Sequence, residues 1–319
     1  MKHVIRRLGV LLVVAGTGLA LWRGVSEPAG PPFAGVVAQP LWKADGPAVL
    51  IDDAHWNAGT SAGRLRAFAG LLVADGYTVL RAGNATRAEM LVDARIAVVA
   101  NPLGVLGTSR RLAHAAGLGG LTFFDDDGLL TQEIETTLQW IENGGSLLLA
   151  ADEQPFARGS QGLAARLGVT MRGRLVVDLG HSEGHEPSRL VFSRENGLLG
   201  GHPIVDGFPD APAVNRVVTF GGQALGPPEG AAVLLRLSTS ATEVARAGDP
   251  PTTGQPVAGL AQAVAFERGR GRVVVLGDSH VLSAEAVPGG PPTGLGWAGT
   301  NNERFVRYVM RWLSRRDER

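Results

Sequence analysis

The sequence predicts an α/β fold in which a mostly parallel sheet is covered by helices on both faces. Short apolar runs bounded by polar residues recur along the first half of the chain, and segments with apolar residues at helical spacing separate them. Strands that alternate with helices in this way form parallel sheets. The chain has 319 residues, of which 45% are hydrophobic and 19% charged, so it is long and apolar enough to bury a large core.

The regular elements of this first half can be assigned in chain order. The expected strands are residues 49–51, 77–80, 96–100 and 146–151, and the expected helices are residues 61–74, 87–94 and 131–142. Thr131 is placed to cap the last of these helices, and Asn143-Gly144-Gly145 is typical of a helix end.

The pattern changes after residue 170. Apolar runs become shorter and turn residues more frequent over about residues 170–240, which predicts a β-rich insertion. Residues 263–266 and 272–276 then have the pattern of a hairpin. The closing segment, residues 301–313, predicts an amphipathic helix whose apolar face carries Phe305, Tyr308, Val309 and Trp312.

The N-terminus has the order of a signal sequence or a membrane anchor. A basic stretch precedes an apolar run at residues 8–22. That run is shorter than the roughly 20 residues of a membrane span, so cleavage and retention as an anchor both stay open. We expect residues 1–24 to be this signal or anchor, residues 25–46 a linker, and residues 47–315 the folded domain. The protein is then extracytoplasmic, either secreted or held in the membrane by its N-terminal segment.

Charge and cysteine content exclude several classes of function. The formal net charge is zero, so the charge balance gives no reason to expect nucleic acid as a partner. The chain contains no cysteine, which excludes disulfides, thiolate metal sites and a cysteine nucleophile. No motif requires a cofactor.

Polar side chains gather where the predicted strands end. They are Asp53, His55 and Asn57 after the first strand, Asp152 and Glu153 after the fourth, Asp278 and His280 after the late hairpin strand, and Asn301 at the start of the last helix. Ligands of open parallel sheets bind beyond the carboxyl ends of the strands. We therefore expect these residues to share one ligand-binding cleft, with the first strand and the late strand as near neighbours.

The polar cluster has two interpretations. Asp and Asn commonly cap helices and stabilise loops, and that role alone could explain them. Alternatively, the oxygen and imidazole groups could hold a divalent metal, with Asp53, His55 and His280 as ligand candidates, or act as general acid and base. Asp52 ranks below Asp53 here, because its side chain could serve the packing of its own strand. No catalytic residue can be assigned.

Several longer stretches carry a family resemblance. IDDAHWNAGTSAGRLRAFAGLLVADGYTV, ENGGSLLLAADEQPF, GGHPIVDGF with VVTFGGQAL, GRGRVVVLGDSHVLSAE and NNERFVRYVMRWL occur in that order. Together they resemble a bacterial family of domains of unknown function with a class I glutamine-amidotransferase-like fold, over about residues 47–315. The resemblance implies a flavodoxin-like sheet and a cell-envelope setting, since similar domains occur in envelope proteins linked to gliding and ABC transport.

The chain also departs from what it resembles. Class I amidotransferases need a cysteine at a sharp turn after a strand, whereas this chain has Ala150-Ala151-Asp152-Glu153 there and no cysteine at all. Glutamine hydrolysis by that thiolate route is therefore excluded. Relatives have a more histidine-rich first motif and an Asp-His pair where this chain has Asp152-Glu153. This difference weakens a metal site carried over by resemblance.

Two functions remain open. The first is an exported or membrane-anchored envelope domain without catalytic activity, which binds an envelope protein or a small ligand through the strand exits. The second is a metal-assisted hydrolase that uses Asp53, His55, Asp152 or Glu153, and His280 as ligands or general base. The missing nucleophile and the absence of a complete catalytic motif favour the first.

Overall fold

The structure is a computed structural model. It describes residues 30–43, 45–81, 87–104, 128–246, 248–285 and 293–316. The predicted signal or anchor segment lies outside the described residues. Within them, none of the helices has the length and apolar character needed to cross a membrane.

The centre of the fold is a sheet whose first five strands are parallel, in the order β2-β1-β3-β4-β14. These strands are β1 (Ala48–Ile51), β2 (Thr78–Arg81), β3 (Ile96–Ala100), β4 (Ser146–Ala150) and β14 (Gly271–Leu276). Counted along the chain, the order is 2-1-3-4-5, which is that of flavodoxin-like sheets. The predicted α/β, flavodoxin-like fold class is confirmed.

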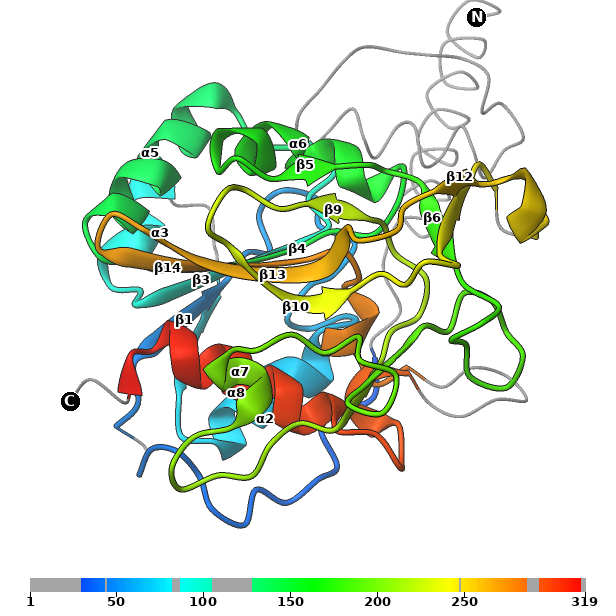
Figure 1. The fold of residues 1–319 in the computed structure, drawn as a ribbon. Coiled ribbons are helices and arrows are strands. Elements are labelled where there is room, and N and C mark those ends of the chain that lie inside the picture. Colours follow the sequence, from blue (N-terminus) through cyan, green and yellow to red (C-terminus); the bar gives the residue numbers. More distant parts are fainter. Residues whose placement is uncertain are drawn as a thin grey trace, which may run out of the picture.

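Helices cover both faces of this sheet, as Figure 1 shows. On one face lie α3 (Arg87–Val92), α5 (Thr131–Glu142) and α6 (Phe156–Arg166); on the other lie α2 (Arg66–Ala74), the short α7 (Pro203–Asp206) and α8 (Asn302–Leu313). The layers explain why the central strands β3 and β4 are continuous apolar runs, since both faces of these strands are buried, whereas the edge strand β2 is partly exposed.

Successive residues of a strand enter different halves of the core. Val98 of β3 belongs to the cluster that contains Phe68 of α2 and Phe305 of α8. The next residue, Val99, belongs to the cluster that contains Ile134 of α5. This alternation follows from the two-residue period of a strand.

The second half of the chain adds the β-rich part that the sequence predicts. β13 (Ala261–Arg268) pairs antiparallel with β14 and leads through β9 (Leu225–Gly226) to β5 (Thr170–Met171), and β10 (Ala232–Arg236) also pairs with β13. Two small sheets and three 3-10 turns complete the described elements: β6 (Leu175–Val177) with β11 (Thr242–Val244) and β12 (Gln255–Pro256), β7 (Val191–Ser193) with β8 (Arg216–Val218), η1 (Pro251–Thr253), η2 (His280–Leu282) and η3 (Gly294–Gly296).

Three local expectations are wrong. β1 and β14 are not near neighbours, because β2 and β3 occupy the two edges of β1, and β3 and β4 separate β1 from β14. Helix α2 begins at Arg66 and not at residue 61, because residues 61–65 form turns first. Thr131 does not cap α5; Leu130 takes the capping position, and the Glu133 carboxylate accepts a hydrogen bond from its N–H at 2.8 Å.

The closing helix docks as predicted. Phe305, Val309 and Trp312 of α8 are 0%, 1% and 8% exposed, and they share a cluster with residues of β4 and β14. The Trp312 ring also lies 4.8 Å from the guanidinium carbon of Arg272 in β14, which fixes the end of the helix to the sheet.

Candidate functional site

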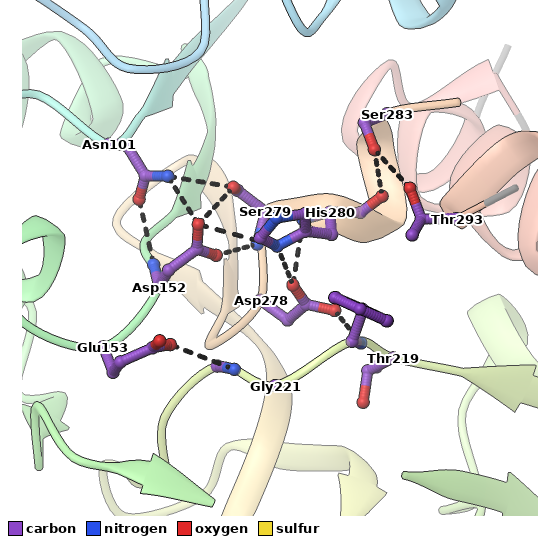
Figure 2. A network of polar contacts seen from close by, with 12 residues as sticks. Asn101, Asp152, Glu153, Thr219, Gly221, Asp278, Ser279, His280, Ser283 and Thr293 are labelled. Atoms are coloured by element: carbon purple, nitrogen blue, oxygen red, sulfur yellow. Dashed lines mark hydrogen bonds and ion pairs between the residues drawn. The ribbon is translucent and has the colours of Figure 1, made fainter. Parts of the chain in front are cut away.

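Asp152 connects the ends of three adjacent strands (Figure 2). It follows β4 closely, Asn101 follows β3, and Ser279 lies three residues beyond β14. One Asp152 oxygen accepts from the Ser279 N–H at 2.6 Å; the other accepts from the Asn101 amide at 2.7 Å and from the Ser279 hydroxyl at 2.9 Å. Asn101 in turn accepts from the Asp152 N–H at 2.9 Å. These reciprocal hydrogen bonds hold the ends of β3, β4 and β14 together. Residues that only stabilise their own loop would not connect three strands.

His280 supplies a positive charge to this network. Its Nδ1 lies 3.1 Å from an Asp278 oxygen and 3.7 Å from an Asp152 oxygen. The second Asp278 oxygen accepts from the Phe220 N–H at 2.8 Å. Burial by itself lowers the pKa of His280, but the charge of Asp152, with the hydrogen bond and charge of Asp278, outweighs it and raises the pKa to about 9. The imidazole is therefore protonated at neutral pH and compensates the two buried carboxylates.

Glu153 lies beside this network but is bound much less tightly. One of its carboxylate oxygens accepts from the Gly222 N–H at 3.2 Å. Burial, followed by repulsion from Asp152, raises its pKa to about 7. Glu153 thus exchanges its proton near neutral pH, as a general acid or base would.

The exit of β1 forms a second histidine network. Nδ1 of His55 contacts both oxygens of Asp52 at 2.9 and 2.8 Å, and Nε2 contacts Glu133 of α5 at 2.9 Å. Burial lowers the pKa of His55, but the two carboxylates raise it above its ordinary value overall. Both ring nitrogens are occupied locally, so His55 does not join the network of His280.

The other predicted site residues hold the backbone. Asp53 accepts from the N–H of Ser61 at 2.8 Å and from its hydroxyl at 2.5 Å, so it stabilises the turn before α2. Asn57 accepts from the His55 N–H at 2.9 Å and donates to a carbonyl at the end of β3. The side-chain oxygen of Asn301 accepts from two backbone N–H groups, at residues 215 and 216. The structure thus gathers Asp152, Glu153, Asp278 and His280 and leaves Asp53, Asn57 and Asn301 elsewhere.

The same cluster contains a possible set of metal ligands. In the part of the chain that the structure describes, one group of His and acidic residues could surround an ion: Asp152, Asp278 and His280, whose ligand atoms lie within 4.8 Å of one another. Of the ligand candidates Asp53, His55 and His280, the set contains only His280; it also contains Asp152, which the hydrolase hypothesis names as a ligand or general base. Asp53 is turned toward Ser61, and His55 is held between Asp52 and Glu133.

Comparison with known proteins supports the fold and goes no further. No family model matches the chain, and no curated protein matches it. Among solved structures, the mmIFT52 N-terminal domain matches at 14% identity with a TM-score of 0.58, over 84% of this chain and 97% of that one.

Two further structural neighbours match with TM-scores below 0.5. A ThuA-like protein from Bacteroides uniformis matches at 14% identity and a TM-score of 0.42, over 88% of this chain and 94% of that one. A GMP synthase-like protein from Thermoplasma acidophilum matches at 12% identity and 0.43, over 86% and 96%. The fold assignment depends on the strand order and on the match to the mmIFT52 domain.

Sequence reasoning missed one partner of His55. Glu133 lies 78 positions from His55, and nothing near His55 in the sequence points to it. Asn101 was recognisable as a strand-exit residue, because it directly follows β3. Its backbone has a φ of +46°, a conformation that Asn adopts more readily than most residues.

Proposed function

We propose that this chain is an exported or membrane-anchored cell-envelope protein whose folded domain binds a ligand or a partner beyond the ends of β4 and β14 and does not catalyse a reaction. The proposal includes membership in the family of amidotransferase-like domains that the ordered stretches resemble. The export part depends on the basic and apolar order of the first residues.

One observation carries the non-catalytic part of this proposal. The charged groups at the strand exits already satisfy one another: Asp152 and Asp278 accept from backbone and side-chain donors on both oxygens, and Nδ1 of His280 faces both carboxylates. The Ser279 hydroxyl donates to Asp152 and accepts from the Asn101 amide, so it is fixed within the network, and hydrogen-bonded groups of this kind act as a rigid support.

A metal-assisted hydrolase is the second candidate. The close approach of Asp152, Asp278 and His280 favours it, as does Glu153, whose pKa of about 7 suits a general base. Coordination through Nδ1 would require His280 to lose the proton that its carboxylate partners stabilise.

Metal content and hydrolysis separate the two candidates. The purified full chain is dialysed against zinc or manganese, washed, and analysed for metal beside the Asp278→Asn variant. We expect the same trace level in both proteins, and no esterase or phosphatase activity that depends on Asp278. About one ion per chain, lost in Asp278→Asn together with an activity, would establish the hydrolase.

Export is tested separately by cell fractionation. We expect the protein in membrane or extracytoplasmic fractions, and a variant without residues 1–24 in the soluble cytoplasmic fraction. The export part is wrong if the full-length protein is cytoplasmic and keeps Met1.

A further inference from the structure

The guanidinium group of Arg189 lies close to two aromatic rings. It lies in the segment between β6 and β7, where its N–H donates to the Glu186 carbonyl at 2.9 Å. Its guanidinium carbon lies 5.5 Å from the centre of the Phe220 ring and 5.8 Å from that of Trp297. Two aromatic rings therefore restrict the orientation of the guanidinium group.

The guanidinium group of Arg189 lacks an acceptor among the described residues. Its Nε is buried and makes no hydrogen bond there, and no carboxylate within the described ranges pairs with it. By contrast, Arg172 and Arg307 have carboxylate partners, each at 2.6 to 2.8 Å. Because the buried Nε is closed to solvent, an acceptor from outside would bind the terminal nitrogens of the guanidinium group, which make no hydrogen bond among the described residues.

Arg189 is continuous with the proposed binding region. Phe220, whose ring touches Arg189, donates its N–H to Asp278, and its ring centre lies 5.6 Å from that of His280. The Phe220 ring thus links the guanidinium group to the end of β14. The Asp278 carboxylate is directed to Phe220 N–H and His280, so it does not neutralise Arg189.

We propose that Arg189 binds the carboxylate group of a small ligand, with Phe220 and Trp297 holding the guanidinium group in place. The inference rests on the proposed ligand-binding function and names the class of ligand. A planar guanidinium group forms two parallel hydrogen bonds with a carboxylate. Among the described residues Arg189 is a single cation without a carboxylate partner, and the Asp278 carboxylate lies at the Phe220 N–H, so a monoanion fits better than a phosphate dianion.

Fluorobenzoate, observed by fluorine NMR at constant ionic strength, is the probe for this site. It is titrated into the full chain, into Arg189→Gln, into Arg189→Lys and into Arg236→Gln, an exposed arginine of β10 that serves as the matched control. We expect saturable binding to the wild-type chain and to Arg236→Gln. Binding should weaken about tenfold or more in Arg189→Gln, because a charge-assisted pair is lost.

One further variant and two competing anions test whether binding depends on the guanidinium group and on the carboxylate. Arg189→Lys should also bind more weakly, because an ammonium group cannot make the two parallel bonds, and this variant retains the charge if Arg189→Gln fails to fold. Acetate should displace the probe more effectively than inorganic phosphate. The inference is overturned if the wild-type chain does not bind in the tens-of-millimolar range, if Arg189→Gln binds equally well, or if phosphate is the better competitor.

The outcome is independent of the test of the proposed function. Probe binding that survives in Arg189→Gln but is lost in Asp278→Asn would keep the binding function and remove the role of Arg189. Stoichiometric metal with hydrolysis would remove the non-catalytic function, whatever the probe does.

Discussion

The charge of His280 predicts a specific dependence of stability on pH. The pKa of His280 is raised from 6.5 to about 9 in the folded protein, despite burial, by Asp152 and Asp278. A group with a raised folded-state pKa stabilises the protein fully below its unfolded pKa, and the contribution is lost as pH rises through the folded value. The shift corresponds to about 3 kcal/mol. The free energy of unfolding should therefore fall by about that amount between pH 6.5 and somewhat above pH 9.

The Asp152→Asn variant tests the origin of this effect. The substitution removes the charge that raises the pKa of His280 most, so the pKa should move back toward its ordinary value. In this variant the new NH₂ group faces the N–H or O–H donors of Asn101 or Ser279 and cannot accept their hydrogen bonds. The free energy of unfolding should therefore fall by about 2–3 kcal/mol at every pH. Asp53→Asn is the matched control, because Asp53 likewise accepts from the N–H and the hydroxyl of one serine, Ser61.

Two measurements read out these changes. Histidine ring shifts are followed by NMR against pH, with His280→Gln to assign the signal, and urea denaturation gives the free energy of unfolding across the same range. The protein is treated with a chelator beforehand. The reasoning is refuted if His280 titrates near pH 6.5 in the wild-type chain, or if Asp152→Asn and Asp53→Asn leave its pKa equally unchanged.

Three further predictions concern other buried groups. Glu153→Gln should stabilise the protein above pH 7, because burial and repulsion raise the pKa of Glu153 to about 7 and the folded state loses about 3 kcal/mol as pH rises from 4.5 to somewhat above 7; urea midpoints that keep the wild-type pH slope would contradict this. Phe305→Ala should cost about 3–5 kcal/mol, since the ring is fully buried between α8 and the sheet, and an unchanged melting temperature would show that α8 is not docked. Glu133→Gln should lower the pKa of His55, measured by NMR, while His280 stays unchanged; a shift of His280 instead would mean that the two networks are coupled.

The layered fold is predictable because buried strands and half-buried helices have different patterns of apolar residues in the sequence. Residues of β3 and β4 enter core clusters on both faces, so the strands are continuous apolar runs that stand out from the amphipathic helices beside them. The order of the strands in the sheet, by contrast, cannot be inferred from the apolar pattern of the individual strands. The residues of β14 would suit pairing beside β1 as well, whereas in the structure β14 pairs with β4 and with β13 of the β-rich part.

The site is predictable only where strand order and local hydrogen bonds agree. Asp152, Asp278 and His280 come together because β4 and β14 are neighbours. Asp52 and Asp53 differ by one position, and that difference turns one carboxylate toward His55 and the other toward Ser61. A single-residue alternation of this kind depends on the local backbone path, which residue type and spacing do not reveal.

The two histidine networks and Arg189 show different ways of placing positive charge near the strand ends. His55 lies between Asp52 and Glu133, and His280 faces Asp278 and Asp152, so each imidazolium balances carboxylates of the protein itself. Such internal pairs cost desolvation free energy and leave little charge for an outside partner. Arg189 is oriented by aromatic rings and has no carboxylate partner within the described residues. The acidic ligand that we propose would therefore bind on the Phe220 side of the site, and the histidine networks would provide its rigid support.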